Sequence, residues 1–125
     1  PGIGLEKIMG WLCSPLAWIM GVPWQDCPIV GQFIGEKTVL NEFVAYAHFA
    51  NYVQEGHQLS YRAYVIATYA LCGFSNFLSI GIQIGGIGAI APGRKSDLAK
   101  MGIYALIGGS LALFMTATIA GILIN

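Results

Sequence analysis

Two long stretches of the chain contain no charged residue, and they limit the fold more than any other feature of the sequence. Residues 63–93 carry no Asp, Glu, Lys, Arg or His, and residues 101–125 carry none either. About 20 mostly apolar residues cross the hydrocarbon core of a bilayer as a helix. The chain is also 56% hydrophobic and only 10% charged, whereas roughly 25% of the residues in an ordinary soluble domain are charged. The sequence therefore predicts an all-α integral membrane protein.

The same composition argues against several other classes of protein. Six basic and six acidic residues give a formal net charge of zero, so we expect no basic surface for phosphates and no nucleic-acid partner. No phosphate-binding loop, close carboxylate pair or nucleophile–base motif is present in the sequence, and we predict that the protein is not an enzyme. Cys13, Cys27 and Cys72 form no C-x-x-C pair, which argues against zinc and for free thiols. Because the chain begins at Pro1 and its start does not resemble a signal peptide, we expect it to be part of a longer protein.

The two uncharged stretches predict different helices. Residues 98–124 indicate a simple final transmembrane helix. Residues 61–92 are too long for a second one, because their uncharged part alone would form a helix of about 46 Å, against a hydrocarbon core of about 30 Å. The middle of this segment, residues 73–81, is rich in glycine, serine and asparagine, which favour non-helical backbone. We therefore predict a broken transmembrane helix with half-helices near 63–73 and 80–91; the alternative is one tilted, kinked helix.

Two further segments are recognised by their patterns of apolar or charged residues. Residues 5–24 are predicted to form an interfacial amphipathic helix and its end: apolar residues recur at three- and four-residue spacing in residues 5–20 beside Trp11 and Trp18, and residues 21–24 end the helix. A short spanning helix is the alternative. Residues 94–100, which contain four of the chain's charges, predict a basic loop before the final helix.

Residues 26–55 are mostly apolar but include Glu36, Lys37 and Glu42. Three charges on a single spanning helix would cost several kcal/mol if they faced lipid. A re-entrant helical hairpin that turns within residues 35–41 would instead place them beside protein. The alternative is an exposed loop, which would leave the apolar run after Glu42 in water.

Three motifs in these segments resemble one known family. Residues 35–46, Gly-Glu-Lys-Thr-Val-Leu-Asn-Glu-Phe-Val-Ala-Tyr, resemble the hairpin motif G-x-K-x-x-x-N-E-F-V-A-Y of concentrative nucleoside transporters. Residues 70–81 resemble the broken-helix signature of the same family, and residues 115–121 resemble its last helix. The resemblance covers the chain from about residue 5 to residue 124. It identifies residues 1–125 as the C-terminal part of a nucleoside transporter's transport domain.

The resemblance also implies roles for particular residues. By position, Glu42 in the hairpin and Asn76 and Ser79 in the broken helix are implied to be ligands of ribose hydroxyls. Phe74 is implied to pack against the base, and Asn41 lies at the hairpin tip. The chemistry of these groups agrees, because a carboxylate accepts hydrogen bonds from hydroxyls while an amide and a hydroxyl both donate and accept.

The family imports nucleosides against their gradient, driven by sodium or by protons. The resemblance thus implies ion-coupled nucleoside import across the plasma membrane, here the bacterial inner membrane, by a multi-pass protein without an organic cofactor. Its partners would be the nucleoside, the lipid bilayer, the remainder of the transporter and two further copies in a homotrimer. The family's other hairpin, which contributes much of the sodium site, has no counterpart in this sequence, so no residue is assigned to the ion.

Two alternatives remain open from the sequence. The chain could be a small helical membrane subunit with an assembly role, in which Glu42 and Asn76 would be interhelical hydrogen-bonding groups. Glu36 stands where the resemblance leads us to expect threonine. It could pair with Lys37, or it could alter the hairpin tip.

Overall fold

The computed structural model describes residues 4–124, and these residues are almost entirely helical. The α-helices along this part of the chain are α1 (Leu5–Ile19), α2 (Cys27–Val39), α3 (Glu42–Gln54), α4 (Tyr61–Leu71), α5 (Phe77–Ile90) and α6 (Lys95–Leu123). Short 3₁₀ turns precede α2 and α6, at Trp24–Asp26 and Pro92–Arg94. The all-α fold class is therefore confirmed.

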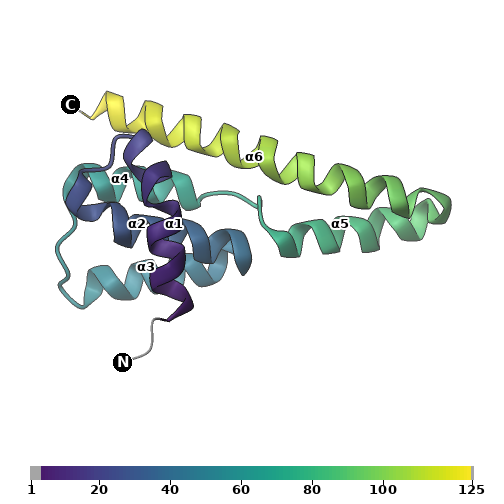
Figure 1. The fold of residues 1–125 in the computed structure, drawn as a ribbon, viewed down its shortest axis with the longest axis horizontal. Coiled ribbons are helices and arrows are strands. Elements are labelled where there is room, and N and C mark those ends of the chain that lie inside the picture. Colours follow the sequence, from purple (N-terminus) through teal and green to yellow (C-terminus); the bar gives the residue numbers. More distant parts are fainter. Residues whose placement is uncertain (1–3, 125) are drawn as a thin grey trace.

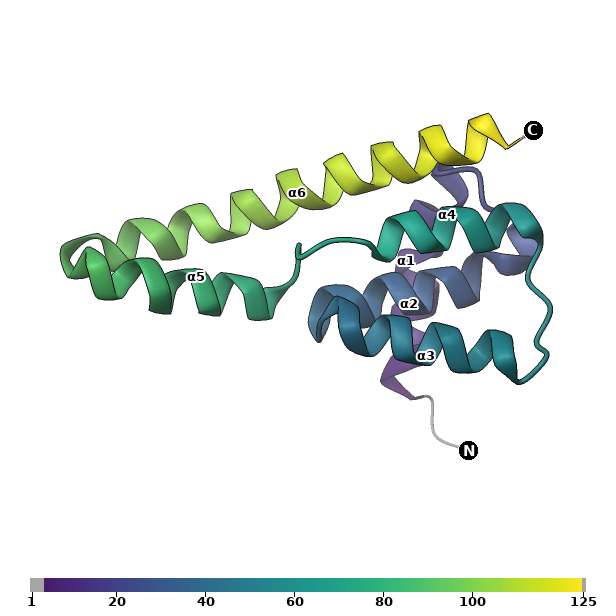
Figure 2. The same ribbon diagram turned by 180° about the vertical axis from the view of Figure 1, so that it is seen from behind.

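Helix α6 runs along the whole length of the molecule and organises the other helices (Figures 1 and 2). Helix α4 packs beneath its C-terminal half and α5 beneath its N-terminal half, so that α4 and α5 follow one another almost end to end. Helices α2 and α3 form an antiparallel hairpin beside α4, and α1 lies crosswise over α2.

The hydrophobic core lies where α2, α4 and the C-terminal half of α6 meet. Its fully buried large side chains come from α2 and α4: Val30, Phe33, Ile34, Ile66 and Leu71. Ser60 caps the start of α4 and donates a hydrogen bond of 2.6 Å to Asp26 just before α2. This bond fixes the start of α4 beside the start of the hairpin.

Helices α1 and α2 cross at a contact made by small residues. A Cβ atom on Gly31 would lie only 2.6 Å from the carbonyl oxygen of Gly10, so the two backbones can approach this closely only without side chains there. The opposite face of α1 leaves Trp11, Leu12 and Trp18 exposed. The helix ends at Ile19, and Gly21, the first of the residues expected to end it, turns the chain with a φ of +95°.

The hairpin turn is shorter than the sequence predicts. Helix α2 continues through Glu36 and Lys37 to Val39, and the non-helical residues are only Leu40 and Asn41. The prediction of a turn over residues 35–41 is therefore wrong. The helix continues because both charged side chains are buried against neighbouring helices, and the backbone bond from Leu40 to Glu36 completes its last turn.

The interruption between α4 and α5 is present in the structure, over residues 72–76. Helix α5 begins at Phe77, three residues earlier than predicted, because the side chain of Asn76 caps it. Helix α6 likewise begins at Lys95, so the predicted basic loop over 94–100 is wrong: most of it forms the first turns of α6, where Arg94 pairs with Asp97 at 2.6 Å.

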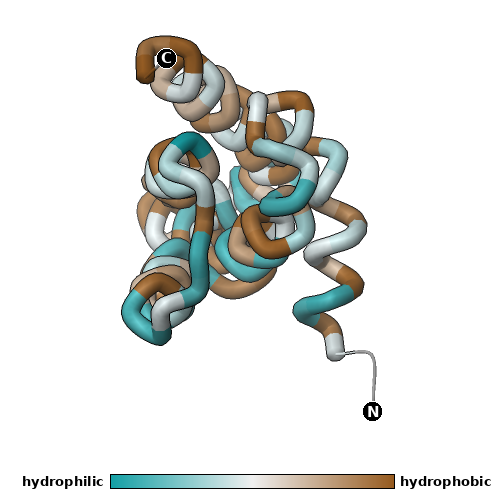
Figure 3. Tube along the Cα trace, turned by 90° about the vertical axis from the view of Figure 1, so that its left-hand side faces the viewer, coloured by the Kyte–Doolittle hydropathy of each residue, from teal (hydrophilic) through white to brown (hydrophobic). Residues whose placement is uncertain are grey.

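Helix α6 with its preceding turn, Pro92–Leu123, is the one helix in the described part of the chain that is long and apolar enough to cross a membrane. The tube in Figure 3 is strongly hydrophobic at the C-terminal end of this helix. Only 17% of its most apolar window is buried within the chain. Most of its apolar surface is therefore left for other contacts.

Candidate functional site

The tip of the α2–α3 hairpin meets the start of α5. Asn41 precedes α3, and its side-chain oxygen accepts a hydrogen bond of 2.9 Å from the backbone N–H of Val44. An asparagine at this position satisfies a backbone donor that the helix itself cannot pair. Glu42 follows as the first residue of α3, where the positive end of the helix dipole favours a carboxylate. The sequence Asn-Glu thus both starts the helix and places a carboxylate at its tip.

Asn76 links this tip to the interrupted helix. Its side-chain oxygen accepts a hydrogen bond of 2.8 Å from the backbone N–H of Ser79 and so caps α5. Its amide nitrogen donates a hydrogen bond of 2.7 Å to Oε2 of Glu42. The side chain is 2% exposed. One buried amide therefore holds the N-termini of α3 and α5 together around a carboxylate.

A groove of about 640 Å³ opens beside this junction, between α5 and α6. Its polar wall is formed by Ser75, Asn76, Ser79 and Gln83, and its apolar wall by side chains such as Ile80, Leu98, Met101 and Tyr104. Phe74 stands at the groove with 77% of its surface exposed. The structure thus brings Phe74, Asn76 and Ser79 to one groove. Glu42 is outside its lining and is joined to it through Asn76.

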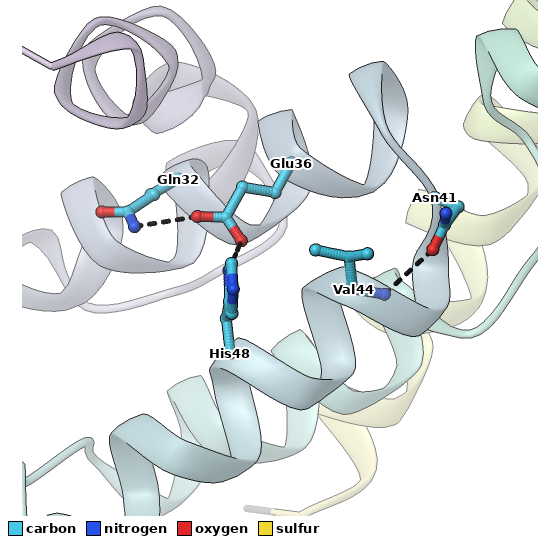
Figure 4. A network of polar contacts seen from close by, with 5 residues as sticks. All are labelled: Gln32, Glu36, Asn41, Val44 and His48. Atoms are coloured by element: carbon cyan, nitrogen blue, oxygen red, sulfur yellow. Dashed lines mark hydrogen bonds and ion pairs between the residues drawn. The ribbon is translucent and has the colours of Figure 1, made fainter.

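A second polar network, which the sequence did not predict, lies within the hairpin (Figure 4). Glu36 accepts a hydrogen bond of 2.9 Å from Gln32 one turn earlier and pairs with Nδ1 of His48 on α3 at 2.8 Å. Glu36 therefore does not pair with Lys37, and that alternative is wrong. The i, i+4 spacing of Gln32 and Glu36 could have predicted their hydrogen bond. The pairing with His48 depends on the register of the two helices.

The described residues contain no group of three or more His, Cys, Asp or Glu side chains that could hold a metal ion. The three cysteines are free thiols. The polar groups at the junction are amides, hydroxyls and one carboxylate, which can donate and accept hydrogen bonds with a polar organic ligand. Helix interruptions whose N-termini surround such groups are typical of secondary transporters. Fold and site together define that class of protein.

Comparison with known proteins gives the family. The family model described as "Na+ dependent nucleoside transporter C-terminus" matches residues 1–121. Solute carrier family 28 member 3 of Mus musculus is 48% identical over 137 residues, which covers 98% of this chain and 19% of the mouse protein. Sodium/nucleoside cotransporter 1 of Rattus norvegicus is 40% identical over 134 residues, covering 98% of this chain and 21% of its own length.

A solved structure agrees with these matches. The transporter CNTnw in an inward-facing substrate-bound state superposes with a TM-score of 0.89 at 48% identity, covering 95% of this chain and 29% of that one. The chain therefore belongs to the concentrative nucleoside transporter family and corresponds to its C-terminal portion. The named relatives are membrane transporters and not enzymes. The chain spans less than a third of the length of the relatives it matches.

Proposed function

We propose that this chain is the part of an ion-coupled nucleoside importer that holds the ribose. The observation that carries the proposal is the hydrogen bond between Asn76 and Glu42, because it joins the hairpin tip and the helix interruption into one polar site. Membership of a nucleoside transporter family supports nucleosides as the substrate class. The presence of a sodium/nucleoside cotransporter among the relatives supports sodium over protons as the coupling ion.

The geometry supports recognition of the sugar. Among the described residues, only Oε2 of the Glu42 carboxylate is engaged, so Oε1 is free to accept a hydrogen bond from a ribose hydroxyl. Ser79, half-buried at the first turn of α5, adds a hydroxyl that donates or accepts. The exposed ring of Phe74 offers a flat apolar face for a base. A sugar carrying both hydroxyls would satisfy these groups, while a deoxy analogue would leave one of them unpaired.

The same proposal places the helices in the membrane. Helix α6 crosses the bilayer, the α2–α3 hairpin enters and leaves from one side, and the interruption between α4 and α5 lies at depth. Non-helical backbone is tolerated there because protein and a wet groove surround it. The exposed tryptophans of α1, which runs crosswise to α6 (Figure 1), suit the membrane interface. The remainder of the transporter supplies the other contacts to the base, the ion site and the trimer contacts.

Uptake measurements in the complete transporter test the ribose assignment. Glu42→Gln and Asn76→Ala should each reduce uptake of radiolabelled uridine and adenosine to background without preventing membrane insertion. The expected loss is large because Asn76→Ala removes the donor to Glu42, and Glu42→Gln replaces a charged acceptor by a weaker neutral one. Hydrogen bonds to charged groups contribute about 1.5–3 kcal/mol. Glu55→Gln is the matched control, since Glu55 is an exposed carboxylate at the other end of α3. Uptake at the wild-type level in both site variants would reject the assignment.

A competition assay tests the sugar contact more directly. Wild-type transporter should prefer uridine to its 2′-deoxy and 3′-deoxy analogues, and Ser79→Ala should reduce one of these two preferences. Phe74→Ala should weaken the binding of uridine and of both deoxy analogues alike, because the ring contacts the base and not the sugar. The alternative of a small assembly subunit is not favoured, since the relatives are transporters and match over nearly the whole chain.

A further inference from the structure

Lys37 is a buried cation whose partner is not obvious. Its side chain lies on α2, is 1% exposed, and its Nζ atom has no hydrogen-bond partner within residues 4–124. The neighbouring acid does not neutralise it, because Glu36 is engaged by Gln32 and His48. A buried ammonium without a compensating charge is strongly unfavourable. A negative charge close to the hairpin tip would offset this cost.

The surroundings of Lys37 identify that group. Lys37 lies in the last turn of α2 and Glu42 is the first residue of α3, so the two-residue hairpin turn brings both to the tip. Glu42 and Cys72, in the interruption after α4, are also the groups whose charges act on Lys37. Its ammonium also stands 6.0 Å from the ring centre of Phe114 on α6, within range of a cation–π contact. Helix α4 ends at Leu71, so the negative end of its dipole lies next to Cys72. Of these groups, Glu42 is the one that carries a full negative charge.

We propose that Lys37 is a positioning residue for the nucleoside site and acts as the counter-charge of the Glu42 carboxylate. This inference rests on the proposed function, because Glu42 is taken to contact the ribose. Asn76 holds Oε2 by a hydrogen bond, and the charge of Lys37 holds the carboxylate from the side of α2. The pair makes the hairpin tip electrically neutral as a unit, which lowers the free-energy cost of burying the ammonium of Lys37. Lys37 does not itself line the groove.

A stability cycle without nucleoside tests the pairing in the complete transporter. The variants are Lys37→Met, which keeps the aliphatic length of the side chain, Glu42→Gln, and the double variant. Lys37→Met should lower the thermal unfolding midpoint by several degrees, because it leaves the half-buried carboxylate of Glu42 without its counter-charge. Adding Glu42→Gln should raise the midpoint back toward the wild-type value. Lys100→Met, which removes an exposed positive charge from α6, is the matched control and should change little.

The outcomes of this cycle are decisive in both directions. Recovery in the double variant supports the pair, including the case in which Lys37→Met alone fails to fold. Equal destabilisation by Lys37→Met in the wild-type and Glu42→Gln backgrounds overturns it, as does failure of both Lys37→Met and the double variant to fold. A purely structural lysine would not be rescued by removing a carboxylate.

Nucleoside binding separates this inference from the proposed function. Lys37→Met should raise the Kd of uridine by about tenfold, which corresponds to about 1.4 kcal/mol, while Lys37→Arg should retain part of the affinity. If the wild-type transporter binds no nucleoside, the proposed function fails although the stability cycle still reports on the pair. If nucleosides bind normally to Lys37→Met, the positioning role of Lys37 is overturned, whereas the assignment of the ribose site is unaffected.

Discussion

The chain contains two regions that are folded by different means. The body, residues 4–71 and 110–124, has a core in which Ile34 is 1% exposed and Ile66 is fully buried. The arm, residues 77–109, consists of α5 and the N-terminal half of α6, and buries only Gly88 and Leu106 among its described side chains. Figure 2 shows the arm extending beyond the hairpin. The candidate site lies where body and arm meet.

The two regions support the candidate site in different ways. The body has a buried core of its own, and the hairpin that carries the tip is packed on that core. The arm carries large exposed apolar side chains on both helices: Phe77, Leu78, Ile82, Ile87, Ile90, Met101, Ile103, Tyr104 and Ile107. Such a surface is stable only when lipid or other protein covers it. The groove is lined by the interruption, α5 and the N-terminal half of α6, so it lies in the region that depends on such surroundings.

The largest expected difference between body and arm is in the effect of an isoleucine-to-alanine substitution on stability. Ile34→Ala in the body should lower the free energy of unfolding by about 2–5 kcal/mol, because it opens a cavity in a packed core. Ile90→Ala in the arm, where the side chain is 87% exposed, should change it by less than about 0.5 kcal/mol. Both are measured by thermal and denaturant unfolding of the complete transporter in lipid. An equally large effect of Ile90→Ala would show that the arm is packed against other protein.

Two glycines sharpen the comparison at a smaller scale. Gly31→Ala should destabilise the body by about 1–3 kcal/mol, because the new methyl group overpacks the crossing of α1 and α2. Gly86→Ala in α5 faces open space within 4 Å and should stabilise the helix by roughly 0.5–1 kcal/mol. The thermal unfolding midpoints of the two variants measure these changes in stability. A stabilising Gly31→Ala would mean that the two helices do not approach as closely as described.

The smallest effect is expected for the ion pair of the hairpin. Glu36 is buried, but His48 is largely exposed and glutamine can still donate a hydrogen bond to Glu36. His48→Gln should therefore lower stability by only about 0.2–1 kcal/mol, and the loss should shrink as salt is added. His57→Gln is the control, since the pair of His57 with Glu55 is exposed on both sides. A double-mutant cycle with Glu36→Gln measures the coupling. A coupling that does not change with salt would place the pair in a more buried environment than the hairpin provides here.

Several features were predictable because they depend on local sequence. A helix of the length of α6 follows from an uncharged stretch, whose composition alone suits lipid. The interruption before α5 follows from short polar residues, and Asn76 acts there as the cap that such residues favour. The residues of the candidate site came from the resemblance of two motifs. Their roles as nucleoside ligands remain predictions.

Other features depended on contacts between segments far apart in the sequence. The hairpin turn was predicted too early, because Glu36 and Lys37 looked incompatible with a continuing helix. Helix α2 nevertheless continues through them, since His48 on α3 pairs with one and the hairpin buries the other. The register of α2 and α3 that allows these contacts cannot be inferred from the sequence of either helix alone.

By itself the sequence determined that the chain is helical, apolar and interrupted near residue 76, because charge spacing and capping act over a few neighbouring residues. Only the tertiary structure decided that Asn76 bonds to Glu42, that Glu36 pairs with His48, and that Lys37 is buried without a hydrogen-bond partner among the described residues. These pairings join residues on different helices. They depend on how the helices cross and on where water is excluded, and neither can be read from residues that are adjacent along the chain.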